Sequence, residues 1–395
     1  MIVKRDLLGK LQASTSLEAV LLWGPRQVGK TTLLMELKPA STLFLDDLSL
    51  RQRAQKDPAF VLDDHKLPCL IDEVQYAPNI FSEIKLRIDR LRRTRLKTGK
   101  KSSTLYYLTG SNRLLLDQNV KESLAGRCHL YSMHGFSVRE ILAHFPELPI
   151  KTLLWRGGFP ELYINQEMSP QRYLNDYILS FIEKDIAASA GIEKLGEFQT
   201  VLGLLAARTA QFLNVSEVAG AAGVDQKTIQ SWIDILQRNH IIELVEPFHS
   251  NLSKRITKMK KLFFYDVGLC ARLQGHNDES LLWNSSQAGG LFETLVFSEI
   301  IKTKDNFLKD WRLFTWRTKE KNEIDFILQN GSDYTFLEAK LAIHGAMPFK
   351  LDAEAKKVFK LPHKKIVVIA GGEQINLDKE TMASPIHSLG SLLLK

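Results

Sequence analysis

The spacing of apolar residues divides the chain into four stretches. Up to about residue 132, short apolar runs alternate with helical spacing, which is typical of an α/β domain with a doubly wound parallel sheet. Helical spacing continues through residues 135–191, and residues 198–269 combine short helices with two apolar runs. The last third returns to strands after one amphipathic helix. We therefore predict domains at residues 1–134, 135–192, 193–272 and 273–395.

A glycine-rich loop follows the first predicted strand, the apolar run at 17–23. The loop, GPRQVGKT, fits the phosphate-binding pattern G-x-x-x-x-G-K-[ST], and residues 31–37 then start a helix. Gly24 and Gly29 let the backbone curl so that successive N–H groups point at the β-phosphate. Lys30 reaches the β- and γ-phosphates, and the Thr31 hydroxyl is a ligand for Mg²⁺. We predict a site for ATP and Mg²⁺ made by Gly24, Pro25, Arg26, Gln27, Val28, Gly29, Lys30, Thr31 and Thr32.

Two later strands end in polar residues. The apolar run 68–73 closes with Asp72, which would hold Mg²⁺ through its shell of waters, and with Glu73, which could polarise the attacking water. The run 105–108 leads to Ser111 and Asn112. A polar side chain there either lies between the other strand ends and orients water or the γ-phosphate, or it belongs to a plain turn. Both interpretations stay open.

Together these residues resemble the AAA+ ATPases, in which a phosphate loop, an Asp-Glu strand and a polar sensor follow one another. The resemblance implies an AAA+ core with a helical lid. It makes Arg127 a candidate finger that reaches the γ-phosphate of a neighbouring subunit in a homo-oligomer, although a surface arginine is the alternative. The run WRGGFP at 155–160 looks like the Gly-Gly-x-Pro turn of prokaryotic AAA lids and implies a nucleotide contact for Arg156.

The third stretch has helix-turn-helix spacing. Residues 215–219 start a short helix, Gly223 makes a turn, and a second helix follows the capping residue Asp225, with Ile229, Trp232, Ile233 and Leu236 on one face. The runs 241–245 and 262–265 predict a hairpin whose loop contains Lys254, Arg255, Lys258, Lys260 and Lys261. The arrangement resembles a winged helix with a basic wing. It can present Gln226, Lys227, Thr228 and Gln230 to double-stranded DNA, or it can serve protein contacts.

The last stretch contains a second set of chemical residues. Glu293 lies on a predicted helix, Asp325 on the strand 323–328, and Glu338 and Lys340 share one face of the strand 334–340. A hairpin between these strands can bring Asp325 beside Glu338. Such carboxylates suit Mg²⁺ or Mn²⁺, with Lys340 placed to orient or deprotonate a water. The order resembles the PD-(D/E)xK nuclease core, which implies catalytic roles for Asp325, Glu338 and Lys340 and metal ligation by Glu293, Asp325 and Glu338.

Over nearly the whole chain, the sequence resembles uncharacterised prokaryotic AAA-type ATPases with a C-terminal domain of unknown function. The phosphate loop, the Leu-Thr-Gly-Ser strand end at 108–111, the Gly-Gly-Phe-Pro turn and the Glu-Ala-Lys strand carry that resemblance. In that family the terminal domain is placed among PD-(D/E)xK folds. Asn112 departs from the family, in which a small hydroxyl residue is more usual at that position.

Composition adds a mild preference for acidic partners. The formal net charge is +8, which favours nucleic acid. The basic run RLRRTRLKTGKK at 90–101 is either a solvated helix face, which we favour, or a prong that contacts phosphates. Cys69, Cys128 and Cys270 have no metal-binding spacing, which predicts reduced packing residues in a cytoplasmic protein. No apolar run approaches the roughly 20 residues of a membrane span, so we expect no membrane partner.

Three functions fit these observations. The first is an ATPase that couples nucleotide state to DNA binding or processing. The second is a nucleotide-switched signalling or scaffold ATPase, in which the nuclease-like domain is inactive and binds protein. The third, a small-molecule kinase, is disfavoured because no acceptor-site signal follows the loop and the long C-terminal region would be unexplained.

Overall fold

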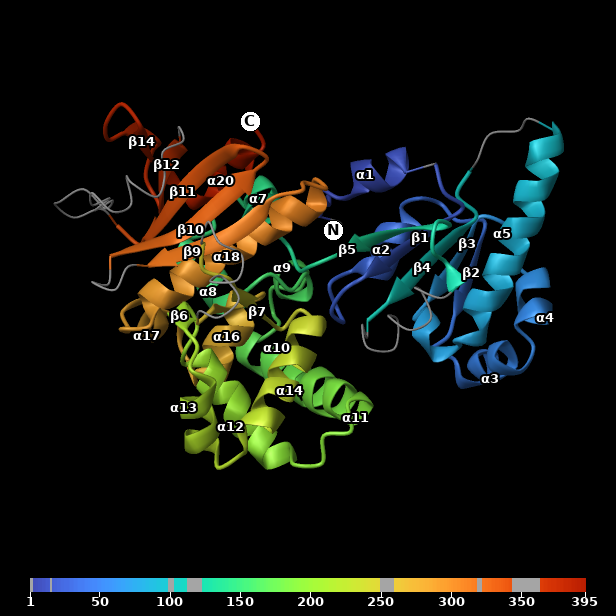
Figure 1. The fold of residues 1–395 in the computed structure, drawn as a ribbon, viewed down its shortest axis with the longest axis horizontal. Helices are drawn as coiled ribbons and strands as arrows, with labels where there is room; N and C mark the ends of the chain where they lie inside the picture. Colours follow the sequence, from blue (N-terminus) through green and yellow to red (C-terminus); the bar gives the residue numbers. More distant parts are fainter. Residues whose placement is uncertain are drawn as a thin grey trace.

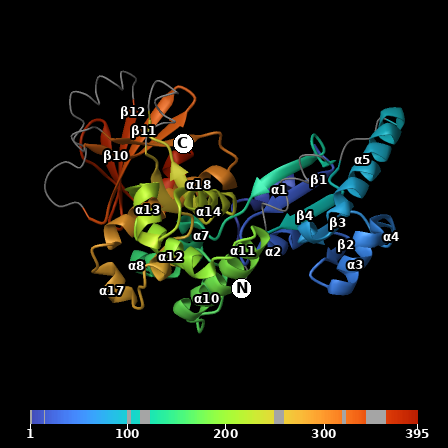
Figure 2. The ribbon, with the colours of Figure 1, turned by 60° about the horizontal axis from the view of Figure 1, so that its bottom comes forward.

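The computed structural model describes residues 3–14, 16–98, 103–111, 123–248, 259–317, 322–342 and 363–395. Figures 1 and 2 place two sheets at opposite ends of the molecule, with the helical middle of the chain alongside the second sheet. Among the described residues, the first sheet belongs to residues 19–132 and the second to residues 312–385.

The first sheet is parallel and has the order β2-β3-β4-β1-β5. Its strands are β1 (Ala19–Trp23), β2 (Ser41–Phe44), β3 (Cys69–Asp72), β4 (Tyr106–Gly110) and β5 (Cys128–Ser132). The predicted α/β domain with a parallel sheet is therefore confirmed. Trp23 pairs with Gly110 and with Ser132, so the carboxyl ends of three strands meet at one edge. Ligands bind outside that edge in open α/β sheets.

Helices cover both faces of this sheet, which explains why β1 and β3 are buried throughout and have no polar alternation. They are α1 (Leu8–Ala13), α2 (Lys30–Met35), α3 (Leu48–Lys56), α4 (Pro58–Asp63), η1 (Val74–Tyr76) and α5 (Asn79–Thr98). The basic run predicted at 90–101 lies largely on α5. Arg92 and Arg95 bind the buried carboxylate of Glu18 at 2.6 and 3.0 Å, so these two arginines tie α5 to the start of β1.

The middle of the chain is mostly helical. Its elements are α7 (Val138–His144), α8 (Ile150–Arg156), α9 (Glu161–Ile164), α10 (Pro170–Tyr177), the π-helix η2 (Ile178–Ile186), α11 (Ala187–Ser189), α12 (Leu195–Ala206), β6 (Gln211–Phe212), α13 (Val215–Ala222), α14 (Gln226–Arg238), β7 (Ile242–Val245), β8 (Lys261–Phe264) and α16 (Val267–Leu273). Asp225 caps α14 through Thr228, and Gly223 ends α13 in the left-handed conformation, as the residue pattern predicts. The four apolar residues predicted on one face of α14 are all buried.

The predicted hairpin is formed by β7 and β8, and β6 joins it in a three-stranded sheet. One part of the prediction for its loop is wrong. Lys261 is not a residue of a basic wing: it is the first residue of β8 and is only 2% exposed. Lys260 pairs with Glu246, and Lys254, Arg255 and Lys258 lie outside the described residues.

The C-terminal sheet has the order β13-β14-β12-β11-β10-β9. Its elements are α17 (Glu279–Trp283), α18 (Ala288–Asn306), β9 (Arg312–Arg317), β10 (Glu323–Asn330), β11 (Asp333–Lys340), β12 (His363–Ile369), β13 (Ile375–Asn376), β14 (Thr381–Pro385) and α20 (Ile386–Leu393). The hairpin expected between the two carboxylate strands is present, since β10 pairs with β11 in antiparallel fashion.

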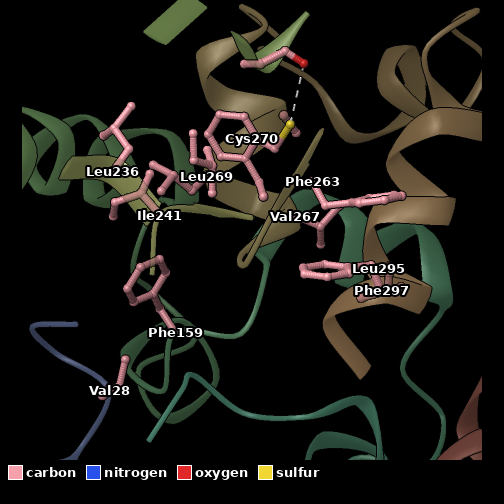
Figure 3. Close-up of a cluster of buried hydrophobic side chains, with 14 of the residues drawn as sticks. Val28, Phe159, Leu236, Ile241, Phe263, Val267, Leu269, Cys270, Leu295 and Phe297 are labelled. Atoms are coloured by element: carbon pink, nitrogen blue, oxygen red, sulfur yellow. Dashed lines mark hydrogen bonds between the residues drawn. The ribbon is translucent and has the colours of Figure 1, made fainter. Parts of the chain in front are cut away.

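One apolar core continues from the first sheet into the C-terminal domain. It contains Val28 of the loop, Phe159, Leu236 of α14 and Phe297 of α18. Figure 3 shows Phe263 of β8 lying against Phe297, and their ring centroids are 4.8 Å apart. Helices α7 and α8, which the sequence assigns to a lid, pack on α20 and on α16 and α17, respectively. The other face of the first sheet has a separate core built with α5.

Candidate functional site

The phosphate loop starts where β1 ends, and its glycines are required by its geometry. Gly24 has a φ of 157°, and a Cβ there would lie 2.0 Å from the carbonyl oxygen of Met133. Gln27 and Gly29 also have positive φ angles, of 62° and 91°. Gly29 then precedes the first residue of α2. The chain therefore makes the tight turn that lets a backbone approach phosphate closely.

Lys30 lies at the centre of this loop and is buried. Its ammonium donates hydrogen bonds to the carbonyl oxygens of Gly24, at 3.0 Å, and Pro25, at 2.8 Å. Burial lowers the pKa of Lys30, and the carboxylates of Glu73 and Asp72 oppose that change only in part. Among the described residues, the carboxylates near this ammonium act on it only at longer range. An incoming phosphate would be an anionic partner bonded to it directly.

Thr31 and Asp72 come together as the sequence predicts. The Thr31 hydroxyl donates to Asp72 Oδ1 at 2.6 Å, and the Thr109 hydroxyl donates to the same oxygen at 2.7 Å. A hydroxyl and a carboxylate at the end of parallel strands are hard oxygen ligands that fit Mg²⁺. Thr109 is a further site residue, which the residue pattern alone does not predict. Its place in the Leu-Thr-Gly-Ser strand end is the signal that could have identified it.

Glu73 is held beside this pair with its side chain fixed. It has a left-handed backbone, with φ at 52°, and its N–H donates to Thr109 Oγ1 at 2.9 Å. Glu73 Oε2 accepts hydrogen bonds from the Ser111 N–H at 3.1 Å, from the Ser111 hydroxyl at 2.7 Å and from the Gln75 amide. Burial raises the pKa of Glu73, but Lys30 and these hydrogen bonds outweigh burial and lower it overall. Asn112 lies outside the described residues.

Arg26 joins the loop to the middle of the chain. Its guanidinium donates to the Tyr76 hydroxyl at 2.6 Å and forms an ion pair with Asp185 of η2, also at 2.6 Å. The pKa of Arg26 is raised overall: burial lowers it, but Tyr76, Asp185, Glu73 and Asp46 favour the charged form more strongly. Asp46, just after β2, is a further acidic residue at this edge; burial and the charges of Glu73 and Asp72 raise its pKa.

A cleft of about 970 Å³ runs alongside the loop. Gln27, Gly29 and Thr32 line one side, while Tyr173, Tyr177 and other residues of α9 and α10 line the opposite side. The loop thus makes a tight turn beside an open, partly aromatic cleft.

The two arginines that the resemblance implicates make contacts within the chain. Arg127 precedes β5, at the edge of the sheet opposite the loop, and binds Asp89 of α5 through two hydrogen bonds of 2.7 and 3.0 Å. Arg156 donates to the carbonyl oxygen of Leu162. The glycines that follow it serve packing: a Cβ on Gly157 would lie 2.1 Å from Asp266 Oδ1, and the Gly158 N–H donates to Asp266 at 2.7 Å.

The C-terminal acidic residues also come together. The Ala339 N–H donates to Asp325 Oδ2 at 2.9 Å, which places Asp325 beside Glu338 across the hairpin. Lys340 Nζ lies 2.9 Å from Glu338 Oε2 and 3.8 Å from Asp325 Oδ2. Burial and the charge of Asp325 raise the pKa of Glu338 to about 8. Burial is also the main cause that raises the pKa of Glu293.

Lys261 is an additional member of this cluster. Its ammonium lies 2.6 Å from Glu293 Oε1 and 3.8 Å from Asp325 Oδ1, and it also binds Glu323. The residue pattern predicts neither contact, since Lys261 of β8 lies 62 residues before Glu323 in the chain. Within the part of the chain that the structure describes, no three His, Cys, Asp or Glu residues are arranged to hold a metal ion.

Three regions of the chain match models of known domain families. Residues 16–142 match the profile of an AAA domain, residues 148–280 match a domain of unknown function (DUF8612), and residues 288–389 match a domain of unknown function (DUF4143). No described helix is long and apolar enough to cross a membrane.

The relatives are themselves uncharacterised. A protein of Mycobacterium tuberculosis is 27% identical over 342 residues, covering 85% of this chain and 74% of that protein. One from Haemophilus influenzae is 22% identical over 352 residues, covering 81% and 82%. A solved protein from Vibrio cholerae, at 12% identity, covers 95% of this chain and 96% of its own, with a TM-score of 0.21. Cdc6p from Pyrobaculum aerophilum, also at 12% identity, covers 62% and 85% with a TM-score of 0.22. Scores this low do not establish a shared fold.

The loop geometry and the matching profile agree on the first domain. The chain carries an AAA domain, which indicates an ATPase, followed by a C-terminal DUF4143 domain.

Proposed function

We propose that this protein is a Mg²⁺-dependent ATPase whose nucleotide state controls contacts made by the rest of the chain. The observation that carries the proposal is the separation of two carboxylates at one strand end. Asp72 is bonded to Thr31, whereas Glu73 is held apart by Ser111 and Gln75. This separation supports a role for one carboxylate toward a metal and for the other toward a water, the two roles that hydrolysis of a phosphoanhydride requires.

Each residue then has one task. Lys30 would leave its two carbonyl partners and bind the β- and γ-phosphates. Thr31 and Asp72 would hold Mg²⁺, which neutralises charge on the phosphates. Glu73, ionised because its pKa is lowered, would accept a hydrogen bond from the attacking water and orient it. The adenosine part would lie in the cleft between Thr32 and Tyr173.

The test of the ATPase compares two variants. Lys30→Ala should lose ATP binding, because the phosphate charge is left uncompensated. Glu73→Gln should keep binding and lose turnover by about two orders of magnitude, because only the group that orients the water is changed. Glu147→Gln, an exposed residue outside the first sheet, is the matched control. Equal turnover in Glu73→Gln and the unmodified protein would refute the role of Glu73.

We further propose that the partner controlled by nucleotide is double-stranded DNA. Two features support this: the net charge of +8, and the exposed side chains of Gln226, Lys227 and Gln230 at the start of α14, after the turn at Gly223. The order of helices α12 to α14 and strands β6 to β8 resembles that of a winged helix, which also supports the proposal.

The test of this partner is turnover with and without double-stranded DNA at two salt concentrations. DNA should raise turnover at low salt and less so at high salt, because phosphate contacts weaken as counterions compete. Lys227→Ala should weaken binding, whereas Lys10→Ala on α1 should not. Identical turnover with and without DNA, together with no binding at low salt, would favour the second candidate.

That second candidate is a nucleotide-switched scaffold whose nuclease-like domain does not cleave. The specific observation in its favour is that Lys261 and Lys340 already neutralise carboxylates of the C-terminal cluster within the chain. If the first candidate also cleaves DNA through its C-terminal domain, Asp325→Ala should abolish any metal-dependent cleavage and leave ATP hydrolysis nearly intact. Absence of cleavage by the unmodified chain in every nucleotide state would support the scaffold.

A further inference from the structure

Helix α5 of the AAA domain carries two sets of basic residues on different faces. The inward set is paired, since Arg92 and Arg95 both bind the buried carboxylate of Glu18. The outward set is exposed and consists of Arg90, Arg93 and Lys97. Spacings of three and four residues place these three side chains on one side of the helix, and we refer to them as the outer stripe.

The outer stripe has no counter-charge in the part of the chain that the structure describes. The acidic residues of α5 are Glu83 and Asp89, and they are already bound by Arg87 and Arg127. Like charges three or four residues apart on a helix repel one another, so the stripe is unfavourable for the helix by itself. The helix dipole favours cations only in the last turn, which contains just one member of the stripe. An anionic partner would remove this repulsion.

The surroundings of the outer stripe do not suit a membrane. Leu86 and Leu96 are exposed on α5, but they lie ten residues apart, or about 15 Å along the axis, and form no continuous apolar face. The apolar side of the helix, with Ile84 and Ile88, is buried in the core of the first sheet. A helix that lies in a membrane surface needs its apolar side free to insert.

The spacing of the outer stripe matches a chain of phosphates. Arg90 and Lys97 are seven residues apart, which is about 10 Å along a helix. One strand of DNA has a phosphate about every 3.4 Å along the duplex axis, so three cations face about three phosphates. Arginine also binds phosphate through two parallel hydrogen bonds. A protein partner would instead need a buried apolar or aromatic anchor at the centre of the contact, and the stripe offers only charge.

We propose that the outer stripe of α5 binds the backbone of double-stranded DNA. Contacts with phosphates position a duplex without reading its base sequence. Figures 1 and 2 place α5 at the end of the molecule away from α14, so this contact is separate from the one proposed for α14. The inference rests on the proposed DNA partner but not on the role of α14 in binding it.

The experiment measures binding of the full chain to a fluorescent DNA duplex of mixed sequence at several salt concentrations. Arg90→Ala/Arg93→Ala should weaken binding about tenfold at about 50 mM salt. The slope of log affinity against log salt should fall by about two, because two phosphate contacts are lost. Arg53→Ala/Lys56→Ala removes two exposed charges from α3 of the same domain and is the matched control, which should change neither quantity.

Equal losses of affinity in the α5 and α3 variants would overturn the inference, since net charge and not the stripe would then attract DNA. Normal DNA binding by the α5 variant, with lost binding to phosphatidylglycerol vesicles, would overturn it in favour of a membrane. Normal ATP turnover without DNA shows that the α5 variant is folded, and Lys97→Ala repeats the test with a single change and a slope lower by about one.

Failure of the proposed DNA partner gives a different result. An unmodified chain that binds no duplex even at low salt would remove that partner and this inference together. Lys227→Ala tests the contact of α14 alone: if it binds DNA normally while the α5 variant does not, the inference stands and the contact proposed for α14 fails.

Discussion

Glu73 illustrates how a single side chain depends on its neighbours. A carboxylate next to Asp72, Asp46 and a buried loop would be expected to take up a proton, since burial favours the neutral form. Ser111 supplies an N–H and a hydroxyl to one of its oxygens, and Lys30 supplies charge, so Glu73 stays ionised. Ser111 is therefore an anchor for the group that we propose orients the water.

We predict that Ser111→Ala lowers the turnover number about tenfold and leaves the KM for ATP nearly unchanged, since the carboxylate keeps its charge but loses its orientation. Steady-state kinetics with excess Mg²⁺ measures both constants. Ser41→Ala at the start of β2 removes a similar hydroxyl far from the loop and should have no effect. A rise in KM with an unchanged turnover number would contradict the anchoring role.

Glu299 gives a second prediction at this scale. Burial raises the pKa of this α18 carboxyl to about 7, although the Val138 N–H donates to it at 2.7 Å. Between about pH 4.5 and pH 7 the folded protein keeps a proton that the unfolded chain releases. The contribution of Glu299 to stability therefore falls as pH rises, by up to about 1.4 kcal/mol per pH unit.

Glu299→Gln cannot ionise and should lose none of this stability. Its thermal midpoint should be close to that of the unmodified protein at pH 5 and higher than it at pH 8. Melting curves at both pH values measure the difference. A difference that does not change with pH would show that Glu299 is already ionised throughout.

Between elements, the clearest link runs from the phosphate loop to η2. Arg26 and Asp185 form an ion pair with both side chains about one-third exposed, so the pair itself adds little stability. The ion pair matters because of where Arg26 lies. The guanidinium interacts electrostatically with Lys30 and Glu73, beside the place where the γ-phosphate would lie. A γ-phosphate would compete with Asp185 for it, and a π-helix such as η2 often marks a functional position.

We predict that Asp185→Asn increases the preference for ATP over ADP by about three- to tenfold, because Arg26 no longer has to leave a carboxylate to meet the γ-phosphate. Arg26→Ala should reduce that preference. Equilibrium titrations with ADP and a non-hydrolysable ATP analogue measure both changes. Asp234→Asn on α14 is the control, and an equal change for both nucleotides would refute a γ-phosphate contact.

At the scale of the whole molecule, the middle and C-terminal parts share a core. Phe263 of β8 packs between Phe297 of α18 and Phe326 of β10, with ring centroids 4.8 and 5.2 Å away. All three side chains are fully buried. Cutting the chain between residues 280 and 288, where the family profiles separate, would expose large aromatic surfaces on both sides.

A fragment of residues 288–395 should therefore aggregate or unfold non-cooperatively, whereas the full chain, which keeps this shared core, should melt cooperatively. Circular dichroism with heating distinguishes them. A cooperative transition in the short fragment would mean that the C-terminal sheet forms an independent domain.

The sequence by itself determined the features that depend on neighbouring residues. The glycine spacing of the loop, the apolar runs at 68–73 and 105–108, the cap at Asp225 and the alternation that joins Glu338 to Lys340 are all local, because period and capping act within a few residues. These were enough to predict an α/β nucleotide site and to group Asp325 with Glu338.

Only the tertiary structure decided which distant groups meet. Ser111 lies 38 residues from Glu73, and Lys261 is 62 residues from Glu323, so neither contact leaves a local pattern. The sequence placed Lys261 in a basic loop because a lysine beside other lysines is usually solvated. In the structure Lys261 is buried among carboxylates instead, since the attraction of three opposite charges exceeds the cost of desolvating one ammonium. These carboxylates come from α18 and β10, so only the packing of the whole chain brings them to Lys261, and composition cannot reveal it.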